Sequence, residues 1–128
     1  MDERTIEIIN RFTNSWTQTE KFYDNLINNY PEFENFRPIR KFISKLKQQG
    51  ENKFFRLGTF IHDLSFSRSV DGNLRPDQKF LKIETINSND FEVTFRDGEK
   101  IYRQYRISDL DDMRLKKLLQ TLKEILAD

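Results

Sequence analysis

The chain contains no cysteine and only one histidine, His62. The lack of cysteine excludes a disulfide framework, a thiolate nucleophile and zinc held by cysteine ligands. A histidine-rich metal site is excluded as well, because one histidine cannot build it. The four glycines form neither a GxGxxG nor a GxxxxGK pattern, so the sequence predicts no glycine-rich phosphate loop. We therefore expect no metal and no cofactor.

Long hydrophobic runs are also missing. No apolar stretch approaches the ~20 residues that span a bilayer, and the acidic start MDERTIEII lacks the basic and apolar regions of a signal peptide. We expect a soluble, cytoplasmic protein without membrane contact, which a cysteine-free composition fits. Alanine, glycine and proline are scarce, whereas Asn, Ile, Lys and Phe are abundant. This usage is typical of an AT-rich genome, and we expect a bacterial source.

Charge and aromatic side chains are what the chain has in abundance. Charged residues make up 34% of its 128 residues, against about 25% in an average globular chain. The formal net charge is nevertheless only +1. Twelve Phe, four Tyr and one Trp are too many aromatic residues for a disordered segment. We predict a single domain over residues 1–128, since this length suits one substantial core.

Residues 79–107 show three successive strand patterns separated by two turns. Apolar and polar residues alternate in each pattern, which indicates strands with one buried face. Asp97-Gly98 is the strongest short signal for a type I′ hairpin turn. The residues that we expect to face the core are Leu81, Ile83, Phe91, Val93, Phe95, Ile101, Tyr105 and Ile107. The opposite face of this predicted sheet is polar and charged, as in an antiparallel sheet that is covered on one side.

Three helical patterns flank these strands: residues 4–30, residues 38–49 and a last helix that opens at Ser108. Short polar and β-branched residues at 13–19 are poor helix formers and predict a kink or break in the first helix. Pro31 ends that helix, and Gly50 suits the end of the second. Ser108 followed by Asp111 fits the pattern of a helix N-cap.

Residues 53–58 and 60–68 read as further strands, with Gly58 marking a bulge or bend between them. In the second of these, His62, Leu64 and Phe66 share one face. The sequence therefore predicts an α+β fold. We expect an antiparallel β-meander sheet of four to five strands, with two N-terminal helices and one C-terminal helix packed on one face.

The polar face of the predicted sheet is the first candidate binding site. Its candidate residues are Arg96, Tyr102, Gln104 and Arg106. Tyrosine and arginine are enriched in binding hot spots. The alternative interpretation is an ordinary charged sheet face stabilised by cross-strand pairs of opposite sign.

The helix at residues 38–49 is the second candidate, because residues 36–56 carry seven basic side chains and one acidic side chain. Arg40, Lys41, Lys45 and Lys47 could present a basic face to nucleic acid or to an acidic protein. A solvated face beside the acidic first helix explains the same pattern. A near-neutral chain favours this second explanation, since nucleic-acid-binding domains are usually basic overall.

His62 and the loop at residues 69–78 complete the candidates. A catalytic histidine needs an orienting partner, and Asp63 points to the opposite face of the predicted strand, so a structural role is favoured. The loop is the longest in the chain and is flanked by Arg68 and Arg75. Long loops often carry function, although the Ser, Asp, Gly, Asn and Pro in this one also suit any solvated loop.

No catalytic group of residues stands out, so a small non-catalytic intracellular binding protein is the favoured function. The expected partner is another protein, met through the open sheet face or the 69–78 loop, as in an adaptor or immunity protein. The alternative is a nucleic-acid accessory protein that uses the basic helix 38–49. An enzyme that uses His62 is the least favoured hypothesis. The sequence leaves the oligomeric state open.

Overall fold

The computed structural model describes residues 2–71 and 77–128. Its elements in chain order are α1 (Glu3–Asn29), η1 (Pro31–Phe36), α2 (Arg37–Gln48), η2 (Glu51–Lys53), β1 (Arg56–Phe60), β2 (Asp63–Ser67), β3 (Lys79–Asn87), β4 (Asp90–Asp97), β5 (Lys100–Ile107) and α3 (Met113–Lys123). The two η elements are short 3-10 helices. The five strands form one antiparallel sheet in the order β1-β2-β3-β4-β5. The predicted α+β meander is thus confirmed.

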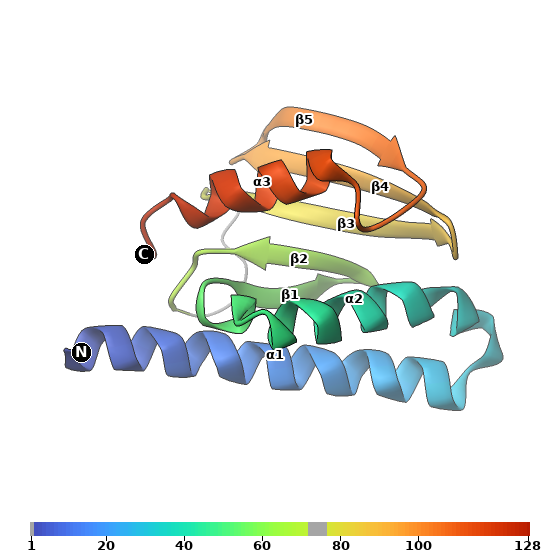
Figure 1. The fold of residues 1–128 in the computed structure, drawn as a ribbon, viewed down its shortest axis with the longest axis horizontal. Helices are drawn as coiled ribbons and strands as arrows, with labels where there is room; N and C mark the ends of the chain where they lie inside the picture. The colour runs from blue at the N-terminus through green and yellow to red at the C-terminus, as the bar shows by residue number, and fades with distance from the viewer. Residues whose placement is uncertain (1, 72–76) are drawn as a thin grey trace.

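The helices cover the sheet unevenly. Figure 1 shows α2 and α3 on one face of the sheet, while α1 runs along the edge formed by β1. We call the face under α2 and α3 the covered face and the opposite one the outer face. The register places Phe66, Leu81 and Phe95 side by side on the covered face. They belong to a core that also contains Trp16 of α1 and Leu122 of α3.

α1 is one unbroken helix of 27 residues, so the predicted kink at residues 13–19 is wrong. Two of the polar residues in this stretch, Ser15 and Thr19, are buried against the rest of the fold. The Ser15 Oγ accepts a hydrogen bond from the Leu57 N–H at 2.9 Å. Tertiary contacts of this kind outweigh weak intrinsic helix propensity. The predicted second helix is confirmed, and Gly50 follows it with a left-handed φ of 82°.

The hairpin of β1 and β2 turns later than the sequence indicates. Phe60 pairs with Asp63, so the turn consists of Ile61 and His62. Gly58 lies inside β1 and pairs with Ser65, which corrects the predicted bend at this glycine. His62 consequently does not share a strand face with Leu64 and Phe66. Ile61 makes the turn with a φ of 60°, an unusual value for a β-branched residue.

One further turn and the start of the last helix also differ from prediction. Between β4 and β5 the loop residues are Gly98 and Glu99, and only Gly98 has a positive φ, at 64°. A type I′ turn requires a positive φ at both positions, so this hairpin is not of that type. The last helix begins at Met113 rather than at Ser108, because the Asp112 side chain caps it by accepting from the Arg114 N–H at 2.8 Å.

A bulge in β5 changes which residues face the core. Phe95 pairs with Arg103 and Arg96 pairs with Ile101, which leaves Tyr102 as an extra residue between them. Ile101 is therefore on the outer face and 47% exposed, so its predicted inward orientation is wrong. Tyr102 packs its ring edge-on against Phe95 at 5.9 Å between ring centroids, although the sequence predicted it on the outer face. Ile107 is buried, as predicted.

Candidate functional site

The outer face of the sheet is hollowed into a groove of about 760 Å³. We call it the sheet groove. It runs from the middle of α1 across β1, β2, β3 and β4 to the turn before β5. The residues that line it are Ser15, Gln18, Thr19 and Phe22 of α1, residues 56–60 of β1, Ser65, Ser67, Phe80, Lys82, Arg96, Gly98 and Glu99.

Small side chains on facing elements explain the hollow. Gly58, Ser65 and Ser67 lie on the outer face of β1 and β2, opposite Ser15 and Thr19 of α1. A Cβ atom added to Gly58 would lie 3.1 Å from the Ser65 Oγ. The glycine therefore leaves space at the bottom of the groove that a side chain would fill. Ser65 and Ser67 are buried. Hydroxyl groups therefore line the bottom of the groove.

Three aromatic rings rise around this floor. Phe22 comes from α1, Phe60 from β1 and Phe80 from β3. Phe60 is 57% exposed, and the Lys82 Nζ lies 5.8 Å from the centre of its ring. Beside Phe60, Ile61 is 76% exposed at the tip of the hairpin. The groove thus joins a polar floor to apolar walls, as ligand-binding clefts do.

The charged residues that line the groove are three cations and one acid: Arg56, Lys82, Arg96 and Glu99. Arg96 donates from Nη2 to the Glu99 carbonyl at 2.7 Å, and Arg56 donates to the carbonyls of Ser69 and Val70 at 2.8 and 2.7 Å. Neither guanidinium is within ion-pair distance of a carboxylate in residues 2–71 and 77–128. These bonds position the two charges without neutralising them.

Lys82 is the cation whose charge has a partner, because its Nζ lies 3.8 Å from the Asp63 carboxylate. Burial raises the pKa of Asp63, and the nearby Glu84 raises it further, while Lys82 opposes both. Burial lowers the pKa of Arg56 and Arg11 adds to this, while Asp71 opposes both. Both directions reflect the cost of keeping a charge in a partly desolvated place.

The four residues predicted from the polar sheet face are only partly brought together. Arg96 lines the sheet groove. Gln104 donates to the Thr94 Oγ1 at 3.1 Å, and Arg106 donates from Nε to the Asp90 carboxylate at 2.9 Å. Tyr102 is turned toward Phe95 by the bulge in β5, and the Arg103 guanidinium stacks over its ring at 4.4 Å. The role of these residues in binding stays a prediction.

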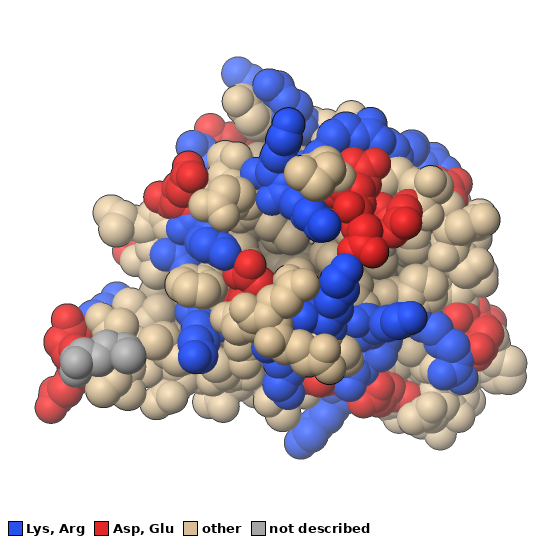
Figure 2. Space-filling view, viewed as in Figure 1, with Lys and Arg blue, Asp and Glu red and all other residues tan. Residues whose placement is uncertain are grey.

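Most of the predicted basic residues of helix α2 form ion pairs with acidic residues of the same chain. Arg40 pairs with Asp24 and Glu20 of α1, at 2.7 and 3.1 Å. Lys47 also pairs with Glu20, and Lys45 pairs with Asp111. Lys41 is the exposed exception. Figure 2 shows basic and acidic side chains interspersed on the face that α2 and α3 present.

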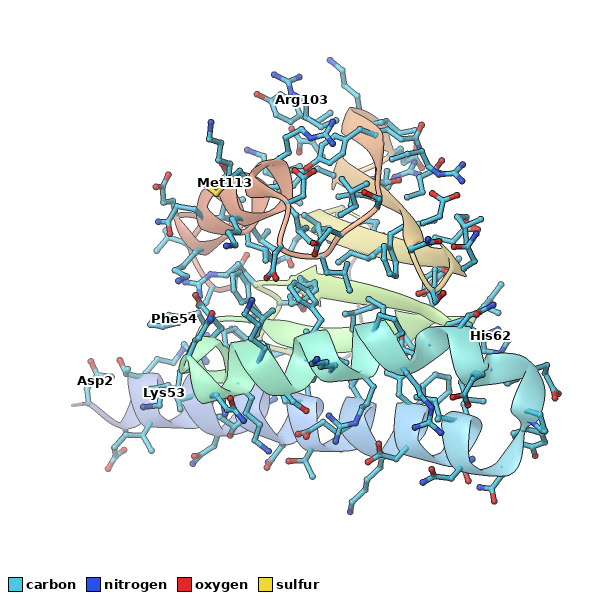
Figure 3. All side chains as sticks on the ribbon, turned by 45° about the vertical axis from the view of Figure 1, so that its right-hand side comes forward. Asp2, Lys53, Phe54, His62, Arg103 and Met113 are labelled. Atoms are coloured by element: carbon cyan, nitrogen blue, oxygen red, sulfur yellow. The ribbon has the colours of Figure 1, made fainter. Side chains whose placement is uncertain are left out.

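His62 lies at the end of the sheet near the connection between α1 and α2 (Figure 3). Its ring packs against Phe33 and Phe36 of η1, with centroids 4.8 and 6.2 Å apart, and its carbonyl accepts from the Tyr23 hydroxyl at 2.9 Å. The predicted structural role of His62 stays a prediction. Among the described residues, no group of three or more potential metal ligands converges, and none of the helices combines the length and apolarity of a membrane span.

The predicted 69–78 loop is described only at its ends, and residues 72–76 lie outside the described part of the chain. Ser69 and Val70 are buried, and the Val70 N–H donates to the carbonyl of Asp128 at 3.0 Å. This end of the loop therefore ties β2 to the C-terminal segment.

The sequence did not predict the contribution of α1 to the site. Ser15 and Thr19 were interpreted as weak helix formers, whereas they form one wall of the sheet groove. The available signal was two small polar residues at positions where the helix stripe should be apolar.

Comparison with protein-family models, curated proteins and solved structures finds no match for this chain.

Proposed function

We propose that this chain is a small non-catalytic binding protein that engages another protein through the outer face of its sheet. The observation that carries the proposal is the sheet groove, in which Arg56 and Arg96 present positive charge beside the exposed ring of Phe60. Arginine and aromatic residues dominate binding hot spots, and a concave site desolvates what it binds. An adaptor- or immunity-like protein of the bacterial cytoplasm is the concrete form that size and composition favour.

The contacts of the chemistry-bearing residues support binding rather than catalysis. The His62 ring packs against Phe33 and Phe36, and in the described part of the chain it forms no side-chain hydrogen bond or ion pair with a carboxylate. General acid–base catalysis needs a titratable group within hydrogen-bond reach of its substrate and a partner that fixes its orientation. The lining of the sheet groove offers a single acid, Glu99, and no histidine.

The alternative, nucleic-acid binding through α2, is less well supported. Three of the four predicted basic residues of α2 have carboxylate partners within the chain, and a net charge of +1 gives little long-range attraction for phosphates. Binding nucleic acid would have to break these pairs. Of the three cations that line the sheet groove, only Lys82 has a carboxylate within ion-pair distance among the described residues, Asp63 at 3.8 Å.

A capture experiment with matched variants tests the proposal. The full chain is used to capture its partner from a lysate of the native host, and the purified partner is then titrated against three double variants. We expect Lys82→Ala with Arg96→Ala to weaken binding by more than ~2 kcal/mol, the scale of hot spots. Lys41→Glu with Lys45→Glu should leave it largely intact. Tyr102→Ala with Arg106→Ala tests whether the interface extends to β5.

Circular dichroism establishes that each variant is folded. Loss of binding in the α2 variant, together with normal binding in the groove variant, would place the interface on α2. The nucleic-acid or acidic-partner hypothesis would then replace this one. A steep fall of affinity with salt would point the same way.

A further inference from the structure

We infer that the sheet groove receives an acidic, extended segment of the partner protein. This inference rests on the proposed function and names the chemistry of what enters the groove. It follows from three properties of the lining: the sign of its charge, the free donors of its arginines and its shape.

The charge of the lining is positive. Arg56, Lys82 and Arg96 face one acid, Glu99, although the whole chain is almost neutral. Lys82 lies 3.8 Å from the Asp63 carboxylate, and Asp71 offsets part of the charge of Arg56, so Arg96 is the least compensated cation of the lining. A carboxylate that enters here gains an opposite charge in a partly buried place, where screening by salt is weaker than on open surface.

The arginines also keep hydrogen-bond donors for a ligand. Arg56 and Arg96 each use Nε and Nη2 to hold backbone carbonyls. Their Nη1 groups donate to no acceptor in the part of the chain that the structure describes. A guanidinium fixed by its own backbone contacts loses little freedom when it binds, and carboxylates are the acceptors that suit it best.

The shape favours a peptide. The groove crosses four strands, whose outer two lie about 14 Å apart at the usual strand spacing, and this distance suits an extended peptide of about four or five residues. Phe22, Phe60 and Phe80 offer apolar walls for the side chains between the acidic ones. Alternate side chains of an extended peptide point to opposite sides, so acidic and apolar residues can be read in turn.

A selection from random peptides tests the inference without knowledge of the native partner. Displayed peptides of about ten residues, long enough to span the groove, are selected on the immobilised full-length protein. We expect the recovered sequences to carry net negative charge. One of them is then synthesised in two forms, with its Asp and Glu either kept or replaced by Asn and Gln, and both are measured by calorimetry.

The acidic form should bind wild type at least about tenfold more tightly than the amide form, a difference of ~1.4 kcal/mol. Arg96→Gln with Lys82→Gln should reduce its affinity by a similar factor. The matched control is Lys117→Gln on the exposed surface of α3, which should change the affinity by less than about twofold. Amide resonances of Gly58, Ser65 and Gly98 report whether the peptide lies in the groove.

Recovered peptides that are neutral or basic, or whose binding survives Arg96→Gln with Lys82→Gln, would overturn the inference. The proposed function would stand in that case if the native partner still lost affinity for the groove variants. Suppose, conversely, that acidic peptides bind in the groove while the native partner binds the groove variants with unchanged affinity. That result would overturn the proposed function alone.

Discussion

The Ser15 hydroxyl of α1 accepts a hydrogen bond from the backbone N–H of Leu57 in β1 at 2.9 Å and donates to the carbonyl of Phe12 at 2.6 Å. One residue further along α1, the Trp16 indole donates to the carbonyl of Phe55 at 2.8 Å. These bonds satisfy backbone groups at the edge of the sheet that no other strand covers. α1 thus closes the β1 edge with side chains, and one of them, Ser15, also lines the sheet groove.

Ser15→Ala should therefore destabilise the protein even though alanine is the better helix former. The substitution leaves the Leu57 N–H buried without an acceptor, and such a loss costs ~1–3 kcal/mol. Chemical denaturation measures the difference. The control is Thr17→Ala on the exposed side of the same helix, which we expect to change stability by less than ~0.5 kcal/mol. Equal effects of the two substitutions would mean that the Ser15 bond contributes nothing to stability.

Replacement by phenylalanine should have opposite effects on stability at two tyrosines, Tyr23 and Tyr105. The Tyr23 hydroxyl donates to the His62 carbonyl at 2.9 Å, whereas the buried Tyr105 hydroxyl has no hydrogen-bond partner among the described residues. Tyr23→Phe should cost ~1 kcal/mol or more, because it removes a bond and leaves the carbonyl unpaired. Tyr105→Phe should be neutral or slightly stabilising. Parallel urea unfolding of the two variants checks both signs, and a larger loss for Tyr105→Phe would contradict them.

The same tyrosines predict how stability responds to alkaline pH. Burial, followed by the charge of Asp63, raises the pKa of Tyr23 above its ordinary value of 10.0. Burial also raises the pKa of Tyr105, to about 12. The folded state therefore holds both protons more tightly than the unfolded state does. The resulting stability is fully present below pH 10, the ordinary value, and is lost as pH rises above it.

Each such group should reduce the free energy of unfolding by up to ~1.4 kcal/mol per pH unit above the ordinary pKa. Urea unfolding at several pH values between 9 and about 11 measures this slope. Tyr23→Phe should flatten it. An unchanged slope in that variant would show that the Tyr23 hydroxyl is not protected from ionisation in the folded protein.

Local sequence patterns predicted the elements well and the site poorly. Alternation placed Phe91, Val93 and Phe95 correctly, because a half-buried strand must alternate. It failed at Tyr102, because this extra residue reverses the sheet face on which the preceding residues of β5 lie. It could not place Ser15 beside Leu57 either, since that contact joins residues 42 positions apart. The sheet groove depends on contacts of this second kind, and a local pattern carries no information on them.

The edge strand β5 leads to a prediction that its charged side chains oppose pairing with another chain. Five consecutive residues, 100–104, are exposed there, and Figure 3 shows Arg103 projecting from this edge. Charged side chains and a bulge are the usual protection of an open strand against pairing with another chain. Lys100→Val with Arg103→Val should make sedimentation depend on protein concentration. Lys117→Val on α3 is the control, and a monomeric β5 variant would show that the bulge alone protects the edge.

The backbone of Ile61 carries the last prediction. Its φ of 60° costs an ordinary L-residue ~1–2 kcal/mol, and a β-branched side chain fits this region poorly. Glycine removes the strain, although it also adds ~0.4–1 kcal/mol of freedom to the unfolded chain. Because Ile61 is 76% exposed, little burial is lost. Ile61→Gly should therefore stabilise the free protein by up to ~1 kcal/mol.

The matched control is Ile86→Gly, which replaces an exposed isoleucine of β3 where φ is not positive. That change should destabilise, since glycine loses more conformational freedom on folding than isoleucine does. If the hairpin tip touches the partner beside the sheet groove, Ile61→Gly should also weaken binding while it raises stability, and strain at functional positions has this signature. Denaturation and titration of the same samples separate the two effects. A variant that is both more stable and equally tight in binding would remove Ile61 from the interface.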